Sequence, residues 1–174
     1  VKGTRGPLPE VGEVKPLSFP AIQRTRLSNG VELVYAQRTA VPVTQIATSF
    51  DAGLAADVPG KLGTERMMLG LLEEGTTRRT SIAIAEEQER LGASIGTGAS
   101  NDRTTVDMSV PSANLAPALD LYANIIRDPA FAEAELARVK AQALAGIKQE
   151  LTSPQGLAGR VLPPLLYGCL LYTS

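Results

Sequence analysis

Residues 93–127 read ASIGTGASNDRTTVDMSVPSANLAPALDLYANIIR, and this stretch decides the fold class. Two runs within it, residues 93–99 and 103–111, are separated by Ser-Asn-Asp, residue types that favour a turn. In the second run Val, Met and Val alternate with Thr, Asp and Ser, which is typical of a strand with one buried face. The stretch therefore predicts two antiparallel strands joined by a short turn.

A helix is predicted directly after these strands, over residues 114–127. One face of it carries apolar side chains at helical spacing: Leu115, Leu119, Tyr122 and Ile126. Pro117 is compatible with this helix only in the first turn, because proline lacks an amide N–H and its ring clashes in a helix interior. A helix with one apolar face needs a surface to cover, and the neighbouring half-buried strand provides one.

The rest of the chain extends this pattern in both directions. Strands are predicted at residues 22–27, 31–37 and 43–51, and helices at residues 62–74, 80–91 and 132–150, with a shorter helix from a break at Ser153-Pro154 to residue 162. In the turn after the first strand, Asn29-Gly30 supplies the positive φ angles of a tight hairpin. Gly75 is expected to end the first helix, and Thr80 or Ser81 to cap the second. Together these elements predict an α+β fold, a mainly antiparallel sheet with helices packed on one face.

Composition and charge exclude several classes of protein. The formal net charge is -1 with no basic block, so nucleic acid is not expected as a partner. No apolar run reaches the ~18 residues that a membrane-spanning helix needs, so no membrane span is predicted. The chain contains no histidine, the commonest metal ligand and general base. Its one cysteine, Cys169, can form neither an intrachain disulfide nor a metal-binding cluster, so no metal or other cofactor is predicted.

Four short segments resemble, in order and spacing, the insulinase/pitrilysin type of zinc metallopeptidase. They are Leu27-Ser28-Asn29-Gly30-Val31, Phe50-Asp51-Ala52-Gly53, Gly75-Thr76 and Leu91-Gly92-Ala93-Ser94. The resemblance covers residues 22–168 and implies a peptidase-like α+β domain that is truncated at its C-terminal end. Residues 1–21 are rich in proline and glycine, so we interpret them as a linker or a processed N-terminus. Residues 169–174 do not continue the resemblance, and we interpret them as a tail of doubtful origin.

The resemblance also implies where a zinc site would lie. The active-site helix of the family carries His-x-x-Glu-His, which provides two zinc ligands and a glutamate that activates water. At these places the chain has Arg66, Leu69 and Gly70. The third ligand of the family, a glutamate in the long helix, falls on Ala145 or Gly146. The motif is degenerate at every ligand, so neither a catalytic residue nor a bound metal is predicted.

Other candidate groups have ordinary explanations. Glu65, Glu73 and Glu74 lie near the degenerate motif and could form an acid/base pair, but we interpret them as the solvated face of a surface helix. Residues 86–90 are interpreted in the same way. A serine nucleophile would need a base other than histidine, and no such pair is evident in the sequence.

Residues 93–98 are the candidate substrate-binding segment. In the family the matching strand takes the peptide substrate by edge pairing, so the resemblance implies contacts with peptide from Ala93, Ser94, Ile95, Gly96, Thr97 and Gly98. Gly96 and Gly98 would let another backbone approach closely. The alternative interpretation is a flexible edge strand without a ligand.

These observations predict a non-catalytic, peptidase-like domain. The family builds its enzymes from two related halves, so the resemblance implies a domain that completes a substrate chamber with a zinc-bearing half, on the same or a separate chain, and that is inactive alone. A periplasmic or otherwise exported location is expected on the same ground. The alternatives are a stand-alone binding or structural protein without a peptidase partner and, less favoured because histidine is absent, an enzyme of unrelated mechanism. An adjacent coding sequence with His-x-x-Glu-His would favour the first interpretation.

Overall fold

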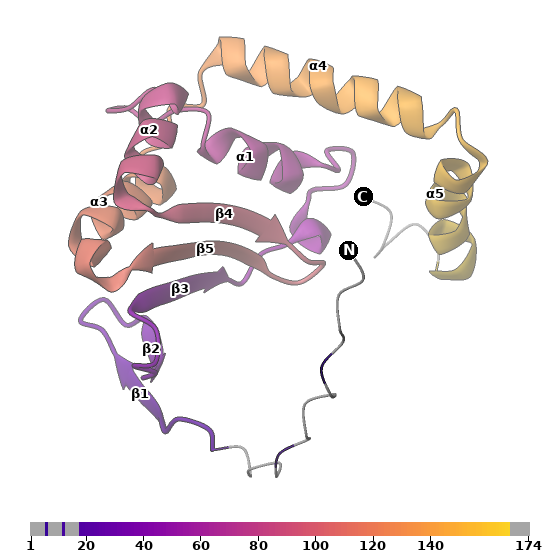
Figure 1. The fold of residues 1–174 in the computed structure, drawn as a ribbon. Coiled ribbons are helices and arrows are strands. Elements are labelled where there is room, and N and C mark those ends of the chain that lie inside the picture. The colour runs from indigo at the N-terminus through magenta and orange to yellow at the C-terminus, as the bar shows by residue number, and fades with distance from the viewer. Residues whose placement is uncertain (1–5, 7–11, 13–17, 168–174) are drawn as a thin grey trace. The chain divides into compact units, whose positions relative to one another are not determined.

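The computed structural model describes residues 6, 12 and 18–167 of the chain (Figure 1). The backbone divides into two compact units, Val1–Val41 and Pro42–Ser174, which are described separately below. Most of the predicted N-terminal linker lies outside the described residues, as do Cys169 and the rest of the predicted tail. The predicted domain limits at residues 22 and 168 stay predictions.

Two short antiparallel strands, exposed throughout, are the regular structure described in the first unit. Strand β1 (Ile22–Arg26) pairs with strand β2 (Glu32–Ala36), as predicted. The turn between them differs from the prediction, because Gly30, with φ of +88°, is its only residue with positive φ. The Gly30 amide donates to the carbonyl of Leu27 at 2.9 Å, so a four-residue turn ends in a left-handed glycine. Asn29 favours this geometry by accepting, through its side chain, a hydrogen bond from the backbone amide two residues on.

Three antiparallel strands form the sheet of the second unit. Their order is β3 (Val43–Phe50), β5 (Thr104–Pro111) and β4 (Ser94–Ala99), with β5 in the centre. The predicted alternation along β5 is confirmed, since its Val and Met side chains are almost fully buried and Asp107 between them is exposed. An antiparallel sheet combined with helices confirms the predicted α+β class.

Helices α1 (Thr64–Leu72), α2 (Ser81–Leu91) and α3 (Leu115–Arg127) cover one face of this sheet. The core is made of side chains from these helices and from that face of β4 and β5: Leu69, Leu72, Ile84, Leu91, Ile95, Val106, Met108, Val110, Ala118, Leu121, Tyr122 and Ile125. Burial of a large apolar side chain contributes about 1.5–3 kcal/mol. The buried Tyr122 hydroxyl is satisfied because it donates to the Val106 carbonyl at 2.6 Å.

Sequence signals at the helix ends are confirmed at α2 but not at α1. Thr80 Oγ1 accepts a hydrogen bond from the Ala83 amide at 3.2 Å, and Gly92 ends α2 with φ of +62°. Gly75, in contrast, lies beyond the end of α1, which stops at Leu72. Its φ of +142° belongs to the loop that follows, so the loop and not the helix end requires this glycine.

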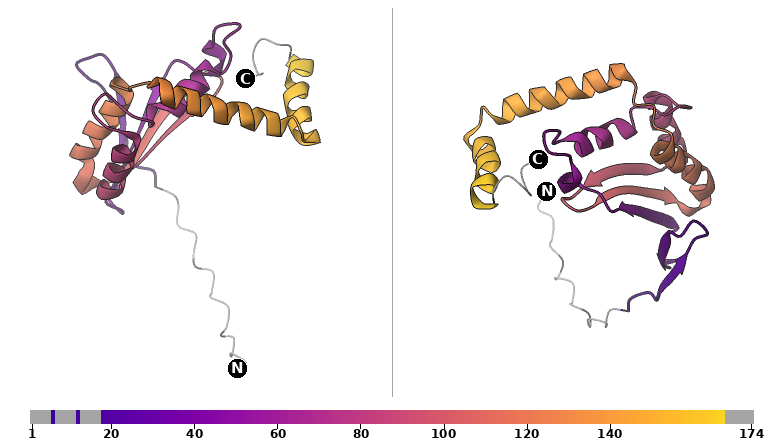
Figure 2. Two further views of the ribbon diagram at one scale, coloured as in Figure 1. Left: turned by 90° about the horizontal axis from the view of Figure 1, so that it is seen from above. Right: turned by 180° about the vertical axis from the view of Figure 1, so that it is seen from behind.

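Two further helices complete the described chain. They are α4 (Glu133–Glu150) and α5 (Pro154–Tyr167), and Figure 2 shows α5 turning away from the axis of α4. Helix α5 runs past the predicted end at residue 162 with Pro163 and Pro164 inside it. The two prolines remove amide donors, but the helix is largely exposed there, so water can satisfy the carbonyls that lose partners. Among the described residues, no helix combines the length and the apolarity needed to cross a bilayer.

Candidate functional site

Helix α1 carries the degenerate motif, and one carboxylate determines where the helix begins. Asp57 follows the short 3-10 turn η1 (Leu54–Ala56) and accepts hydrogen bonds from the Gly63 amide at 2.6 Å and the Glu65 amide at 2.9 Å. A negative charge at a helix N-terminus satisfies free amides and interacts favourably with the helix dipole. Sequence reasoning missed this role, because Asp57 lies several residues before the helix, in a loop whose path depends on the fold.

The three motif positions of α1 lie in different surroundings. Leu69 is 7% exposed and belongs to the core, whereas Arg66 is exposed. Gly70 faces α4, because a Cβ placed on it would lie 3.6 Å from Cγ1 of Val139. None of the three offers a lone pair to Zn²⁺, since a guanidinium stays protonated, leucine is apolar and glycine has no side chain. The motif positions therefore present no metal ligand.

The candidate position for a third ligand lies further along α4. Ala145 and Gly146 are exposed, and a Cβ placed on Gly146 would meet no atom within 4 Å. Helix α4 meets Gly70 at Val139, and six residues of helix span about 9 Å. Throughout residues 18–167, the described body of the chain, no three His, Cys, Asp or Glu side chains are placed to hold a metal ion. The residues at the motif positions therefore do not fit a zinc ion.

An apolar groove of about 420 Å³ lies between α1 and the start of α4. Its lining is mostly aliphatic, thioether and aromatic: Leu62, Met67, Met68, Leu71, Phe131 and Leu136, together with Lys61, Gly63 and Thr64. A groove of this composition suits an apolar side chain and offers no pair of groups for acid/base chemistry.

The carboxylates in α1 and directly after its end are partnered, so the prediction of a solvated face is wrong for them. Glu74 forms an ion pair with Arg138 of α4, and Glu65 accepts a hydrogen bond from the hydroxyl of Thr104 in β5. Glu73 is half-buried, and this burial raises the pKa of its carboxyl, while a hydrogen bond with Gln88 acts in the opposite direction. These carboxylates anchor α1 to its neighbours, and their partners are too distant in the chain to be read from local pattern.

Replacing Glu73 with Gln is expected to stabilise the fold at neutral pH. Because the folded-state pKa of Glu73 is raised, its carboxyl contributes stability below its unfolded pKa, and that contribution is lost as the pH rises through the folded pKa. A neutral amide removes this loss, so the stability of Glu73→Gln should change less with pH. Urea denaturation from acid to neutral pH measures the effect, with Glu89→Gln on the exposed face of α2 as the control. A wild-type protein that is more stable than Glu73→Gln at neutral pH would contradict the expectation.

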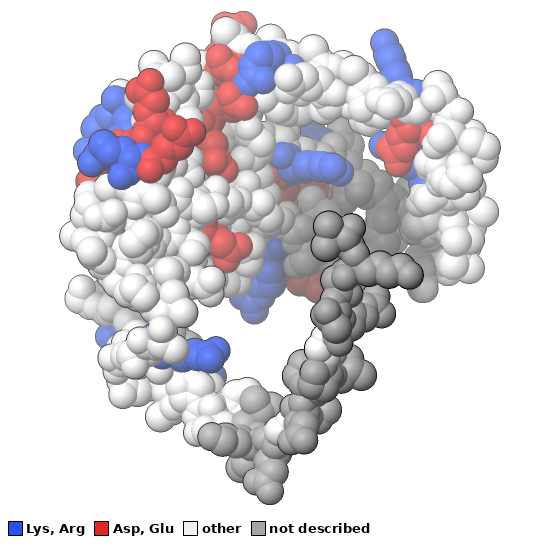
Figure 3. All heavy atoms as spheres, viewed as in Figure 1, with Lys and Arg blue, Asp and Glu red and all other residues white. Residues whose placement is uncertain are grey.

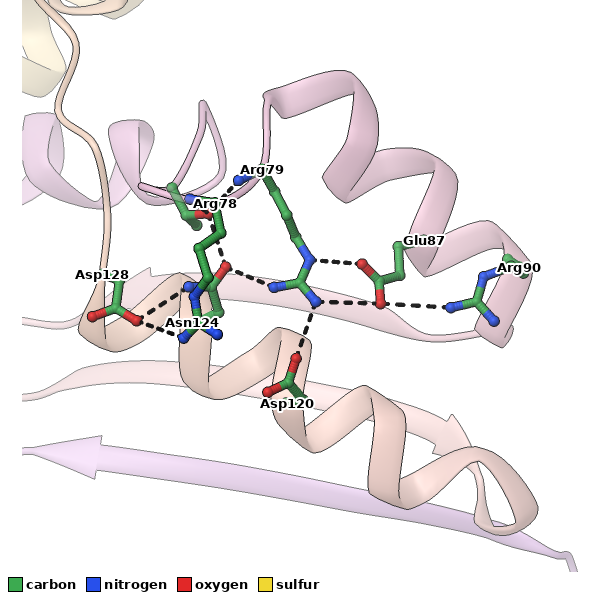
Figure 4. Close-up of polar contacts among 8 residues, drawn as sticks. Arg78, Arg79, Glu87, Arg90, Asp120, Asn124 and Asp128 are labelled. Carbon is green, nitrogen blue, oxygen red and sulfur yellow. Dashed lines mark hydrogen bonds and ion pairs between the residues drawn. The ribbon is translucent and has the colours of Figure 1, made fainter.

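A polar network ties the loop after α1 to α2 and α3 (Figure 4). Arg79 lies at its centre and donates to Glu87 at 2.7 Å, to Asn124 at 2.8 Å and to Asp120 at 3.0 Å. The side chains of Arg79 and Glu87 are only 18% and 21% exposed. The prediction of a solvated face at residues 86–90 is therefore wrong for Glu87. In the view of Figure 3, acidic and basic side chains are intermixed over α2.

The same network explains the Gly-Thr pair that follows α1. The Thr76 hydroxyl donates to Oδ1 of Asn124 at 2.8 Å and accepts from the amides of Arg78 at 3.2 Å and Arg79 at 2.9 Å. Asn124 is 1% exposed, and its amide nitrogen donates to Asp128 at 3.1 Å. A buried side-chain amide is stable only when it is hydrogen-bonded, so Thr76 and Asn124 hold the loop in one conformation. The signal that could have found Asn124 is its place as a polar residue among the apolar ones of α3.

Arg79→Met is expected to lower the free energy of unfolding by about 2–3 kcal/mol, because it leaves the mostly buried Glu87 carboxylate with only the longer contact to the exposed Arg90, at 3.5 Å. Arg78→Met is the matched control. Arg78 also pairs with a carboxylate, Asp128 at 3.1 Å, but the Arg78 side chain is 61% exposed. Exposed pairs contribute about 0–1 kcal/mol. Denaturation in urea compares the two variants. Equal losses in the free energy of unfolding would show that burial does not make the Arg79 contacts stronger than the exposed Arg78 pair.

Strand β4 is an edge strand, as predicted, because among the described strands it pairs only with β5. Helix α1 lies alongside it (Figure 1). Of the six candidate residues Ile95 is buried, and the others are exposed or half-buried: Ala93, Ser94, Gly96, Thr97 and Gly98. A second groove of about 420 Å³ lies across the three strands and is bordered by Gln45, Ala47, Ser94, Gly96, Asp107 and Ser109. Contact of these residues with peptide stays a prediction.

The fold and the site together define an α+β domain in which a short helix lies beside the edge strand of an antiparallel sheet and has Arg66, Leu69 and Gly70 at the motif positions. A family model described as Insulinase (Peptidase family M16) matches residues 33–162. The chain therefore belongs to the insulinase family, peptidase family M16.

Curated relatives agree with this assignment. "Probable mitochondrial-processing peptidase subunit beta, mitochondrial" of Arabidopsis thaliana is 29% identical over 122 residues, which are 70% of this chain and 23% of that protein. An "Uncharacterized zinc protease" of Rickettsia bellii is 28% identical over 114 residues, which are 66% of this chain and 28% of that protein. The chain thus spans about a quarter of the length of these relatives.

Two solved structures share the fold. A crystal structure described as a peptidase M16 inactive domain from Pseudomonas fluorescens superimposes with a TM-score of 0.78 and 28% identity, over 88% of this chain and 37% of that one. A protease from Helicobacter pylori superimposes with a TM-score of 0.71 and 22% identity, over 79% of this chain and 33% of that one. The second likeness concerns the fold alone.

Proposed function

We propose that this chain is a non-catalytic M16 domain that completes a substrate chamber with a zinc-bearing partner half. The observation that carries the proposal is the motif helix, which remains in the fold with Arg66, Leu69 and Gly70 where ligands and base would stand. The likeness to a structure described as an inactive domain supports a role without catalysis. Relatives named as the beta and alpha subunits of a mitochondrial-processing peptidase support a partner half.

Within the chamber, the edge of β4 is the proposed surface for the peptide. An edge strand presents unpaired backbone donors and acceptors, which an extended peptide can match by adding a strand. Gly96 supports this role, because nothing lies within 4 Å of a Cβ placed on it, so the sheet surface beside the edge is open. Recognition of this kind depends on backbone groups and fits a surface with few charged side chains.

The purified chain is expected to hold no stoichiometric zinc and to cleave no peptide. A catalytic zinc site needs about three protein ligands, and the motif positions supply none. Metal analysis of the chain measures the first expectation, and a quenched fluorescent peptide, with and without chelator, measures the second. A zinc-bearing half with His-x-x-Glu-His, encoded next to this chain, should bring chelator-sensitive cleavage when the two are mixed.

Three outcomes of this experiment would count against the proposal. One tightly held zinc per chain contradicts the loss of the site, and chelator-sensitive cleavage by the chain alone contradicts the lack of catalysis. The control for contaminating peptidase is the same mixture with the motif glutamate of the partner half replaced by Gln, which should be inactive. A mixture that cleaves peptide no faster than the zinc-bearing half alone would favour a stand-alone binding or structural protein.

We further propose a periplasmic or otherwise exported location, which the family resemblance supports. Fractionation of the source cells, with antibodies against the chain, tests the location directly. Recovery of the chain in the cytoplasmic fraction alone would contradict it.

A further inference from the structure

The backbone groups of β4 alternate between its two edges. Ser100, at the turn end of the β4–β5 hairpin, donates its amide to the Arg103 carbonyl at 2.8 Å, which places it on the side of β5. Successive residues of a strand direct their N–H and C=O groups to opposite sides. Ala99, Thr97 and Ile95 therefore direct theirs to the outer edge, where no described strand pairs with β4.

One group on this outer edge is already occupied. The amide of Ile95 donates to Oε1 of Gln88 in α2 at 2.9 Å. The main-chain carbonyl of Gln88 accepts the amide of Ala93 at 2.9 Å, so this residue holds the start of β4 at two points. The prediction of a solvated face at residues 86–90 is therefore also wrong for Gln88, which is half-buried.

The orientation of the Gln88 amide follows from its bond to the strand. Its oxygen accepts from Ile95 at 2.9 Å, so its NH₂ group is left to donate. The nearby Glu73 carboxyl, whose pKa Gln88 lowers, favours a donor on this side. Turning the amide away from the strand would leave the Ile95 amide without this acceptor, so the Gln88 side chain is a built stop at one end of the edge.

We propose that Gln88 sets the register of a bound peptide, because its side chain already accepts the hydrogen bond of the Ile95 amide. An extended segment then hydrogen-bonds to the backbone of Thr97 and Ala99 and ends before the Ile95 amide. The inference rests on the proposed function, since it assumes that β4 takes a peptide strand. Strand β4 ends at Ala99, so Thr97 and Ala99 are its only residues beyond Ile95 that direct backbone groups to the outer edge. The open part of the edge is thus short, and it accommodates a few residues of an extended polypeptide.

Amide hydrogen exchange of the full chain tests the proposal, resolved by residue with NMR. The probe is a ten-residue peptide of alternating Thr and Val with one Lys at each end, blocked at both termini. In the wild type the Ile95 amide should be protected before peptide is added, and Thr97 and Ala99 should gain protection afterwards. In Gln88→Met without peptide, the Ile95 amide should exchange about tenfold faster than in the wild type, because one hydrogen bond is lost. The same amide should gain protection when peptide is added.

Two controls keep the result decisive. Gln88→Asn keeps the amide but is one methylene too short to reach Ile95, so it should behave like Gln88→Met and serves if that variant does not fold. Glu89→Met places the same side chain on the exposed neighbour in α2 and should match the wild type. Protection of the Val106 and Met108 amides from exchange, in the buried central strand, shows that the chain is folded in every sample.

The outcomes separate the two hypotheses. If the Thr97 and Ala99 amides gain protection but the Ile95 amide exchanges at the same rates in the wild type and in the Gln88 variants, peptide binding at β4 stands and the role proposed for Gln88 is wrong. If no β4 amide gains protection in any chain, the peptide surface itself is wrong, and the register proposal falls with it.

Discussion

Gly53→Ala is expected to lower the free energy of unfolding by about 3 kcal/mol. Gly53 is buried and has φ of +145° and ψ of -178°, a conformation that side chains of L-amino acids rarely adopt. A Cβ placed there would lie 2.6 Å from the Asn101 carbonyl oxygen and 2.7 Å from the Arg103 amide nitrogen. Both atoms belong to backbone, so no side chain can turn aside to make room.

The damage should spread to the turn between β4 and β5. The amides of Leu54 and Ala55 donate to the carbonyls of Ser100 at 3.0 Å and Asn101 at 2.9 Å, and a Cβ on Gly53 would push these partners apart. Gly96→Ala is the control, because it adds the same methyl group where no atom lies within 4 Å. Urea denaturation compares the two, and the control should stay within about 0.5 kcal/mol of the wild type. A loss below about 1 kcal/mol in Gly53→Ala would show that the loop relaxes around the methyl group.

Restoring the family motif is expected to destabilise the fold without giving activity. The triple change Arg66→His, Leu69→Glu and Gly70→His places two imidazoles on one helix face, but it also puts a carboxylate at a position that is 7% exposed in the core. An unpaired charge at such a site costs about 3 kcal/mol or more. The new imidazole at residue 70 must also share its space with Val139, whose Cγ1 would lie 3.6 Å from the new Cβ. Two ligands without a third leave zinc affinity weak.

A staged series separates these effects. Gly146→Glu alone should stabilise α4 by about 0.5–1 kcal/mol, because glycine is a poor helix former and this position is open. Added to the triple change, it supplies a third ligand, a carboxylate, only if α4 brings residue 146 to the motif. Zinc titration by calorimetry and cleavage of a fluorescent peptide measure each stage, with Leu69→Met as a control that keeps an apolar side chain in the core. Zinc-dependent turnover by the triple variant alone would mean that the third ligand has been placed wrongly.

Much of the fold follows from local pattern. The alternation in β5 and the helical spacing in α3 predict the sheet and the helix that packs on it, and the structure confirms both. The predicted apolar face of α3 is wrong at Leu119, which is 39% exposed, because the buried face is turned towards Leu121 and Ile125. The caps at Thr80 and Gly92 were equally predictable, because capping depends on residues within one turn of the helix end. Where local chemistry is ambiguous the predictions are less accurate, as in the hairpin turn at Gly30 and the continuation of α5 through Pro163.

The polar groups were predicted less well than the apolar ones. Glu73, Glu87 and Gln88 occupy ordinary surface positions in the helical pattern, yet each is half-buried and has a partner on another element or in the loop after α1. Hydrophobic spacing assigns a residue to a face of its own helix. Hydrophobic spacing does not show which other element packs over the edge of that face. These three side chains lie at such edges, so their partners could not be predicted.

The sequence by itself determined the order of strands and helices and the absence of a zinc-binding motif, because periodicity is local and because a chain without histidine cannot supply imidazole. The tertiary structure alone decided that Asp57 caps α1, that Asn124 holds Thr76 and that Gln88 closes the edge at Ile95. The physical reason is that the strength of a hydrogen bond or ion pair depends on distance and burial, and these are set by elements that are far apart in the chain.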